Sequence, residues 1–260
     1  MPERLKIIVA YDGAGFEGWQ SQLHRNTIQD HLEQAFRRIT GARVRVHGAG
    51  RTDAGVHALG QCAHADLADR RMTASNCLAA LNAILPPRIR VLRARFVSQA
   101  FHARYSVTGK VYRYRIWTGP ILPPHEFQRS WHIPVKLDFD LLATASNQFV
   151  GRHNFAGFAA NRGKSKIAKQ RNKLNADREE STIRTIRSVK VRRRGPLVTI
   201  EFDGDGFLYK MVRLAVGASV QVAKHKLSTS EIADRLGSGS VRGQRFSAPA
   251  DGLFLVRVWY

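Results

Sequence analysis

One aspartate stands out because of the residues around it. Asp53 follows Arg51 by two positions inside HGAGRTDAGVHALGQ, residues 47–61. Asp followed by Ala-Gly is favourable turn chemistry, because the carboxylate can accept a hydrogen bond from the backbone two residues on. The alternative is chemical: a nucleophilic carboxylate must be ionised, and a neighbouring arginine favours the charged form. Asp53 is therefore either a turn residue or a reactive group.

The charge of the chain bears on that choice. Its 260 residues hold 42 lysines and arginines against 20 aspartates and glutamates, a formal net charge of +22. A field this positive attracts the phosphate backbone of a nucleic acid, which is the first partner to expect. A carboxylate in a phosphate-binding cleft weakens that attraction, so its presence there favours a chemical role for Asp53.

An arginine far along the chain could be the partner of Asp53. Arg213 lies in YKMVRLAVG, within a helical stretch whose apolar stripe comprises Leu208, Met211, Val212, Ala215 and Val216. Arginines are rarely buried unpaired, so Arg213 needs an acid or a route to the surface. Pairing with Asp53 and snorkelling to solvent are both open.

Aromatic and cationic residues alternate in VYRYRIW, residues 111–117. Tyr112 and Tyr114 lie on one face of this predicted strand, and Arg113 and Arg115 lie on the other. Proteins that bind single-stranded nucleic acid use aromatic rings to stack on bases and guanidinium groups to hold phosphates. The tyrosines can equally pack inward against a helix, and one ring at the edge of a cleft can serve both purposes.

Two further motifs could carry other chemistry. GAGFEG at 13–18 matches the dinucleotide pattern, but the predicted helix begins about ten residues later, so a nucleotide cofactor is not expected. A nicotinamide or flavin enzyme stays as an alternative that NAD binding would test. Asp203 and Asp205 could form an acid–base pair, although within FDGDGF they fit a turn better.

The remaining composition argues against metal and membrane proteins. Cys62 and Cys77 are too few for a disulfide framework, and with His64 they match no paired-cysteine zinc pattern, so no metal is expected. The chain has no apolar run long enough to span a membrane. MPERLKIIVAYDG reads as a strand rather than a signal peptide. We therefore expect a cytoplasmic protein.

Hydrophobic periodicity predicts an α+β fold. Helices are expected at 27–39, where Asn26 and Gln29 resemble a capping box, and at 73–85, 139–151 and 207–225. Strands are expected at 5–13, 42–48, 59–67, 88–97, 111–117, 185–194, 196–204 and 253–260. The first half has the element order of a ferredoxin-like, or RRM-like, unit, and the second half repeats it.

A short echo supports two related halves. YDGAGF at 11–16 returns as FDGDGF at 202–207. We expect halves at 1–103 and 104–260, with the aspartate loop in the first and the two sheets joined around a central basic cleft. The segment 159–181 has seven basic and three acidic residues and almost no large apolar ones. It is either a solvated loop or an arm that orders on RNA.

Taken together, the chain resembles the TruA family of tRNA pseudouridine synthases. YDGAGFEGWQ, AGRTDAGVHALGQ, FHARYSVTGKVYRYRI, HNFAGF, GFLYKMVR and VRVWY occur in the order of that family. The second motif is highly specific. The basic segment 159–181 is longer than the family pattern.

The resemblance implies roles for four residues. Asp53 would be the catalytic nucleophile, Tyr112 would stack on the target base, Arg213 would pair with the aspartate, and Arg51 would help to displace the target nucleotide. It also implies a homodimer with a pseudo-twofold in each chain, no cofactor, and uridines 38, 39 and 40 of the tRNA anticodon stem-loop as substrates. A noncatalytic RNA-binding protein on the same scaffold is the alternative.

Overall fold

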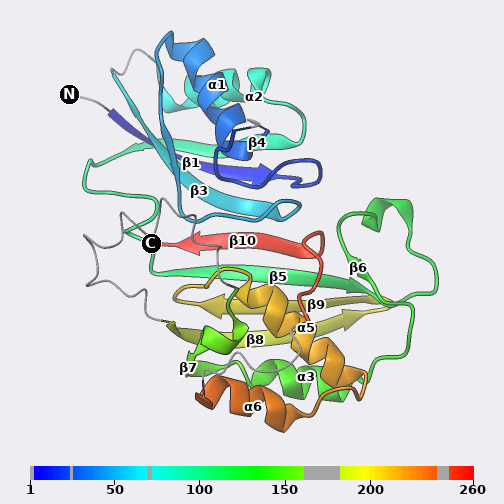
Figure 1. Cartoon of the computed structure of the whole chain (residues 1–260). Coiled ribbons are helices and arrows are strands. Elements are labelled where there is room, and N and C mark those ends of the chain that lie inside the picture. The colour runs from blue at the N-terminus through cyan, green and yellow to red at the C-terminus, as the bar shows by residue number, and fades with distance from the viewer. Residues whose placement is uncertain (1–2, 24–25, 69–71, 161–181, 239–245) are drawn as a thin grey trace.

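The computed structural model describes residues 3–23, 26–68, 72–160, 182–238 and 246–260. These residues build one large mixed sheet with helices packed against it (Figure 1), which confirms the predicted α+β class. The basic segment 159–181 lies outside the described residues except for its first two positions. Each helix in the described part is too short or too polar to span a bilayer.

Both parts of the chain contain helices and strands. The first 103 residues form β1 (Glu3–Tyr11), α1 (Ile28–Thr40), β2 (Val46–Gly48), β3 (His57–Leu67), α2 (Ala74–Ile84) and β4 (Ile89–Val97). The later residues form β5 (Gly109–Trp117), β6 (Trp131–His132), α3 (Phe139–Asn147), β7 (Gly151–Asn154), β8 (Ile183–Arg194), β9 (Leu197–Gly204), α5 (Met211–Ala223), α6 (Thr229–Ser238) and β10 (Leu253–Trp259). Short 3₁₀ helices occupy Pro124–Glu126 and Phe155–Phe158.

The sheet runs continuously through both parts of the chain. Its strand order is β4-β1-β3-β10-β5-β9-β8-β7, with β2 paired to β3 and β6 paired to β5. The last strand, β10, therefore lies in the middle, between β3 and β5 (Figure 1). It runs parallel to β3, where Phe254 and Leu255 pair with His57 and Ala58, and antiparallel to β5. This arrangement brings the loop before β3 close to β5.

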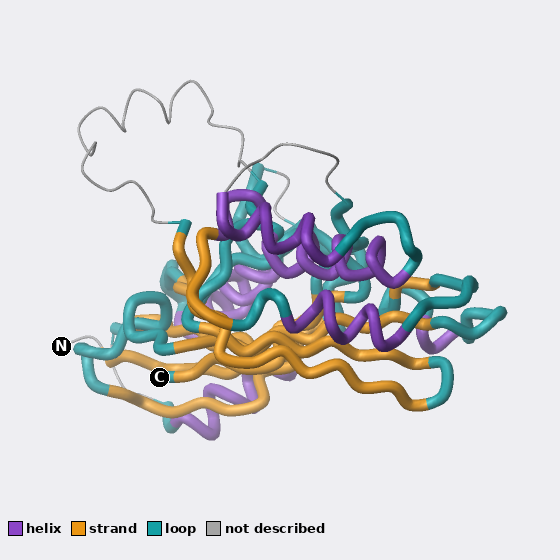
Figure 2. Tube along the Cα trace, turned by 90° about the horizontal axis from the view of Figure 1, so that it is seen from below, coloured by secondary structure: helices purple, strands orange, loops and turns teal. Residues whose placement is uncertain are grey.

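The core forms because strand residues alternate between the two faces of the sheet. Leu5, Ile7 and Val9 of β1 are fully buried, as are Tyr114 and Ile116 of β5. Most of the helical turns lie on one side of the strand layer (Figure 2). α1 and α2 contact each other, α2 also packs on β4, and α3 packs on α5 and β8.

The helix predicted at 27–39 is confirmed, but the predicted cap is wrong. Thr27 is the N-cap, and its side chain accepts a hydrogen bond from the backbone N–H of Asp30. Asn26 lies one position before this cap, and its side-chain amide donates to the carbonyl of Gly15. The capping residue therefore lies one position later, and Asn26 instead ties the loop before the helix.

The other predicted elements are present with changed ends. Only 46–48 of the strand expected at 42–48 pairs with β3, and Gly41 ends α1 in a left-handed conformation. The helix expected from 207 begins at Met211, because Lys210 has a φ of 59°. α6 was not predicted.

Two glycines provide a test of the packing. Gly217 lies within α5, and a Cβ added there would lie 1.8 Å from the carbonyl oxygen of Phe246. Alanine normally favours a helix over glycine by about 1 kcal/mol. We expect Gly217→Ala instead to lower the free energy of unfolding by about 1–3 kcal/mol, because the segment at 246 must move. Urea denaturation measures this.

Gly237→Ala is the matched control. Gly237 is also helical, in α6, and nothing lies within 4 Å of its added Cβ. That substitution should raise stability by up to about 1 kcal/mol. Equal effects of the two substitutions would contradict the close approach of Phe246 to α5.

Candidate active site

Asp53 lies in the loop between β2 and β3, and the GAGFEG segment holds that loop in place. A Cβ on Gly13 would lie 2.1 Å from the carbonyl oxygen of Val56, and one on Gly18 would lie 2.5 Å from that of Thr52. Gly18 also has a φ of +87°, which favours glycine. The glycines therefore let two backbones pack together.

A buried hydrogen bond fixes the same loop from the side of the sheet. The hydroxyls of Tyr11, at the end of β1, and Thr52 lie 2.8 Å apart. Trp19 supports the loop as well, because its backbone N–H donates to the carbonyl of Thr52. Thr52 precedes Asp53 directly, so these contacts limit where the carboxylate can lie.

Asp53 forms an ion pair with Arg213. The Nη1 atom of Arg213 donates to Oδ2 of Asp53 at 3.0 Å, and the two side chains are 14% and 22% exposed, respectively. The pairing considered from the sequence is therefore present. It joins a loop of the first half to α5 of the second half, across 160 positions of sequence.

The guanidinium of Arg213 is anchored on its other side as well. Its Nε donates to the carbonyl of Ala248 at 2.8 Å, and the backbone N–H of Ala248 donates to the carbonyl of Arg213. Arg213 lies in the first turn of α5. One planar side chain thus spans two acceptors, which favours arginine over lysine at this position.

The two tyrosines of the β5 stripe have different environments. Tyr114 is fully buried, and its hydroxyl donates to the carbonyl of Pro249. Tyr112 lines a cavity and makes an edge-on contact with Phe207, with ring centroids 5.0 Å apart. Burial raises the pKa of Tyr112 well above its usual range, so its phenol stays neutral. Tyr112 therefore offers an aromatic surface rather than a charge.

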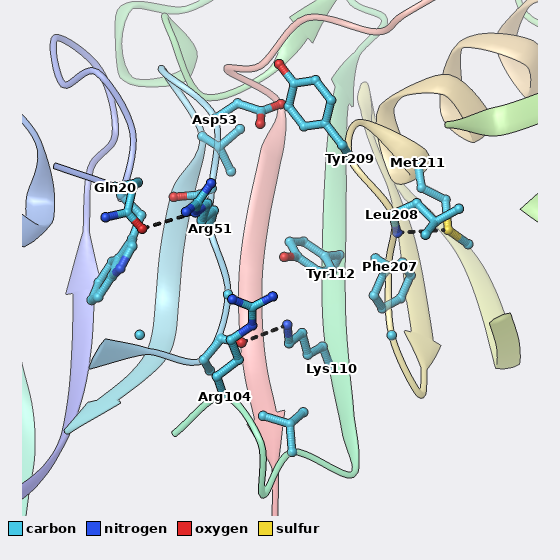
Figure 3. A pocket seen from close by; sticks show the side chains of 18 of the residues that line it. Gln20, Arg51, Asp53, Arg104, Lys110, Tyr112, Phe207, Leu208, Tyr209 and Met211 are labelled. Carbon is cyan, nitrogen blue, oxygen red and sulfur yellow. Dashed lines mark hydrogen bonds between the residues drawn. The ribbon is translucent and has the colours of Figure 1, made fainter. Parts of the chain in front are cut away.

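Arg51 lies on the rim of the same cavity. Its side chain is exposed, and its Nε donates to Oε1 of Gln20 at 3.1 Å (Figure 3). Arg213, rather than Arg51, makes the ion pair with Asp53. Arg51 can therefore contact a bound molecule while the aspartate keeps its own cation.

The cavity has a volume of about 1170 Å³ and brings all four predicted site residues together. Its lining is strongly basic, with seven cationic side chains and two carboxylates. The cations are Arg45, Arg51, Arg104, Lys110, Arg184, Lys210 and Arg213, and the acids are Asp53 and Asp205. Such a lining attracts phosphates. In the view of Figure 3, the Asp53 carboxylate points toward the ring of Tyr209, which also lines the cavity.

Lys110 lines the cavity but was not predicted from the sequence as a site residue. It lies on β5 two residues before Tyr112, so both side chains project from the same face. Its Nζ donates to the carbonyl of Ala49 at 3.1 Å, and a Cβ on Gly50 would lie 2.6 Å from it. Burial, with repulsion from Arg104 and Arg184, lowers the pKa of Lys110 to about 8. The alternation that marked Tyr112 could have identified it.

Other sequence candidates do not form a site. Asp203 binds Arg187, and Asp205 accepts a hydrogen bond from the backbone N–H of Thr185, so the pair supports a turn. Cys62 and Cys77 belong to different core clusters. Within the described ranges, no group of three or more His, Cys, Asp or Glu side chains is arranged to hold a metal ion.

Comparison with known proteins identifies the family of the chain. The family model described as tRNA pseudouridine synthase matches residues 7–106 and 145–260. The chain belongs to the tRNA pseudouridine synthase family. Membership of this family makes it an isomerase that forms pseudouridine.

Individual tRNA pseudouridine synthases match nearly the whole chain. A protein named tRNA pseudouridine synthase A from Akkermansia muciniphila is 45% identical over 260 residues, covering 99% of this chain and 95% of the relative. Proteins of the same name from Methylacidiphilum infernorum and Acetivibrio thermocellus are 38% and 36% identical, each over 98% of this chain and over 94% and 99% of the relatives, respectively.

Lys110 provides a pH-dependent test of the basic cavity. Its pKa falls from the ordinary 10.5 to about 8 on folding, so the unfolded chain binds this proton more tightly. The charged lysine therefore costs stability below pH 8, and the cost vanishes as pH rises toward 10.5. We expect Lys110→Met to raise the free energy of unfolding by about 1–2 kcal/mol at pH 7, and by less at pH 10. Urea denaturation at both pH values measures it.

Lys190→Met is the control for that substitution. Lys190 lies on β8 and is exposed, so removing its charge should leave stability within about 0.5 kcal/mol at both pH values. A Lys110→Met variant that is less stable than the wild type at pH 7 would show that the ammonium is well solvated or firmly paired.

Proposed function

We propose that this protein converts uridine to pseudouridine at positions 38, 39 and 40 of the tRNA anticodon stem-loop, with Asp53 as the catalytic nucleophile. The single observation that carries the proposal is the placement of Asp53: a carboxylate paired with Arg213 lines the same strongly basic cavity as the ring of Tyr112. The motif order shared with the family supports the choice of substrate.

The reaction explains why these residue types are needed. The N1–C1′ bond of a uridine breaks, the uracil turns, and its C5 joins C1′; C5 loses a proton and N1 gains one. No atom or electron is added overall, so the chemistry needs no redox cofactor. The carboxylate can attack C6 of the uracil or C1′ of the ribose, or remove a sugar proton.

Each site residue has a role in this proposal. The target base must leave its stack, which costs a few kcal/mol, and the neutral ring of Tyr112 offers a surface for the displaced uracil. Arg51, exposed on the rim, contacts the phosphate backbone and helps to hold the nucleotide out of its stack. Arg213 pairs with the carboxylate and orients it through its second anchor at Ala248.

We also propose two ferredoxin-like halves, 1–103 and 104–260. The strand orders support this division: β4-β1-β3 with β2 beside β3 in the first half, and β10-β5-β9-β8 in the second. In each half, the last strand along the chain pairs with the first: β4 pairs with β1, and β10 pairs with β5. This strand order is the one expected of a ferredoxin-like unit. The family resemblance further supports a homodimer, and a tRNA substrate supports a cytoplasmic location.

The role of Asp53 can be tested by tritium release. Joining C5 to C1′ displaces the hydrogen on C5, so unmodified tRNA labelled there with tritium should release label into water. We expect Asp53→Asn to reduce this release by at least about 10³-fold while RNA binding is retained, because the amide cannot act as the nucleophile.

Two outcomes would contradict the proposal. Full release with Asp53→Asn would return Asp53 to the role of a turn residue. No release by the wild type from several tRNAs, with binding intact, would favour the noncatalytic RNA-binding alternative.

Two substitutions of Arg213 test whether its positive charge alone is enough for catalysis. Arg213→Lys keeps the cation but cannot span Asp53 and Ala248, so we expect a loss of about 10- to 100-fold in single-turnover tritium release. Arg213→Gln removes the charge and should cost more, about 10³-fold. Thermal unfolding of both variants separates lost catalysis from lost folding. Equal rates for the two variants would rule out an electrostatic role.

A further inference from the structure

An exposed aromatic ring lies on the wall of the cavity and has no role in the proposed chemistry. Tyr105 is 77% exposed and lines the same cavity as Asp53 and Tyr112. It belongs to the turn between β4 and β5, outside the stripe that the sequence analysis identified. A single exposed ring is common at a protein surface, but this ring lies in the lining of a strongly basic cavity.

A network of hydrogen bonds holds the backbone of this turn. The Nδ1 atom of His102 accepts from the backbone N–H groups of Arg104 and Tyr105, at 3.1 and 3.3 Å. The backbone of His102 also exchanges two hydrogen bonds with Ser106: its N–H donates to Oγ, and its carbonyl accepts from the N–H. The turn therefore fixes where the Tyr105 side chain leaves the backbone.

One face of the Tyr105 ring is already stacked. The rings of Tyr105 and His102 lie nearly parallel, with centroids 4.3 Å apart and an interplanar angle of 29°. Behind them, His102 meets His64 edge-on at 4.6 Å, and His64 stacks on His47 at 5.0 Å. Tyr105 is thus the outermost ring of an aromatic stack that reaches into the protein.

Burial disfavours the charged form of two rings in the stack. Burial, with repulsion from Arg4 and the two neighbouring histidines, lowers the pKa of His64 to about 4, and burial also lowers the pKa of His102. His64 is buried, and its Nδ1 accepts from the backbone N–H of Ala103. Uncharged rings provide a flat, polarizable surface suited to another aromatic ring.

Cations flank the exposed ring. The guanidinium of Arg104 lies 5.8 Å from the centre of the Tyr105 ring. In the view of Figure 3, Tyr112 lies between Asp53 on one side and Arg104 and Lys110 on the other. A ring beside phosphate-attracting groups is the arrangement with which proteins hold unpaired nucleotides.

We infer that Tyr105 is a second stacking platform, which binds an unstacked nucleobase of the RNA near the target uridine while Arg104 and Lys110 hold its phosphates. The ring of His102 covers one face of Tyr105, and the base covers the other. This inference rests on the proposed function, because it needs an RNA whose local stacking is disrupted in the cavity.

Binding measurements in an Asp53→Asn background test the inference without turnover. The probe is an anticodon stem-loop RNA that carries 2-aminopurine at one nucleotide adjoining the target, moved through the flanking positions one at a time. We expect Tyr105→Ala to weaken binding about 5- to 100-fold, and Tyr105→Phe and Tyr105→Trp to stay within threefold. At one labelled position, fluorescence should be quenched with tyrosine but not with alanine.

The salt dependence separates stacking from charge. Tyr105→Ala should leave the slope of log affinity against log salt unchanged, whereas Arg104→Gln should reduce it by about 0.7–0.9. Phe127→Ala is the matched control: its ring is 65% exposed but lies outside the cavity, so affinity should stay unchanged. Thermal unfolding checks that the variants fold.

Affinity of Tyr105→Ala within twofold of the parent would overturn the inference. So would Tyr105→Phe as weak as Tyr105→Ala, because the hydroxyl and not the ring would then carry the contact. These failures differ from failure of the proposed function, which is read from wild-type tritium release and its loss in Asp53→Asn.

Discussion

The ion pair between Asp53 and Arg213 is the constraint on which the site depends. Each charge is mostly removed from water and would be unfavourable alone. The two residues come from elements 160 positions apart, so they meet only if the sheet places them together. The continuity of β3, β10 and β5 is therefore a requirement of the site as well as a feature of the fold.

The segment just before β10, residues 248–250, contacts three parts of the structure that surround the cavity. The carbonyl of Ala248 accepts from Arg213, and that of Pro249 accepts from the hydroxyl of Tyr114. Ala250 lies against the Asp53 loop, 3.3 Å from where a Cβ on Gly55 would stand. One short stretch just before β10 thus contacts α5, β5 and the Asp53 loop, which fits the position of β10 in the middle of the sheet.

The sequence predicts the features that depend on the spacing of neighbouring residues, but not the contacts that depend on the fold. The apolar spacing of 27–39 was enough to find α1, and the isolation of Arg213 among apolar residues was enough to require a partner. The GAGFEG glycines show the limit: their spacing reveals that something approaches closely, but only the fold reveals that it is the backbone at Thr52 and Val56. Tyr105 was missed because exposure and stacking on His102 are tertiary properties.

The basic cavity reflects a conflict between binding and stability. Burial works against charge at this end of the cavity: it keeps His64 neutral and brings the pKa of Lys110 to about 8. Burial lowers the pKa of His64 and of His102, while Lys110 keeps most of its charge at neutral pH. A phosphate beside Lys110 would favour its protonated form, since an opposite charge raises the pKa of a lysine. The lysine that weakens the free protein is therefore the one whose charge the bound RNA would stabilise.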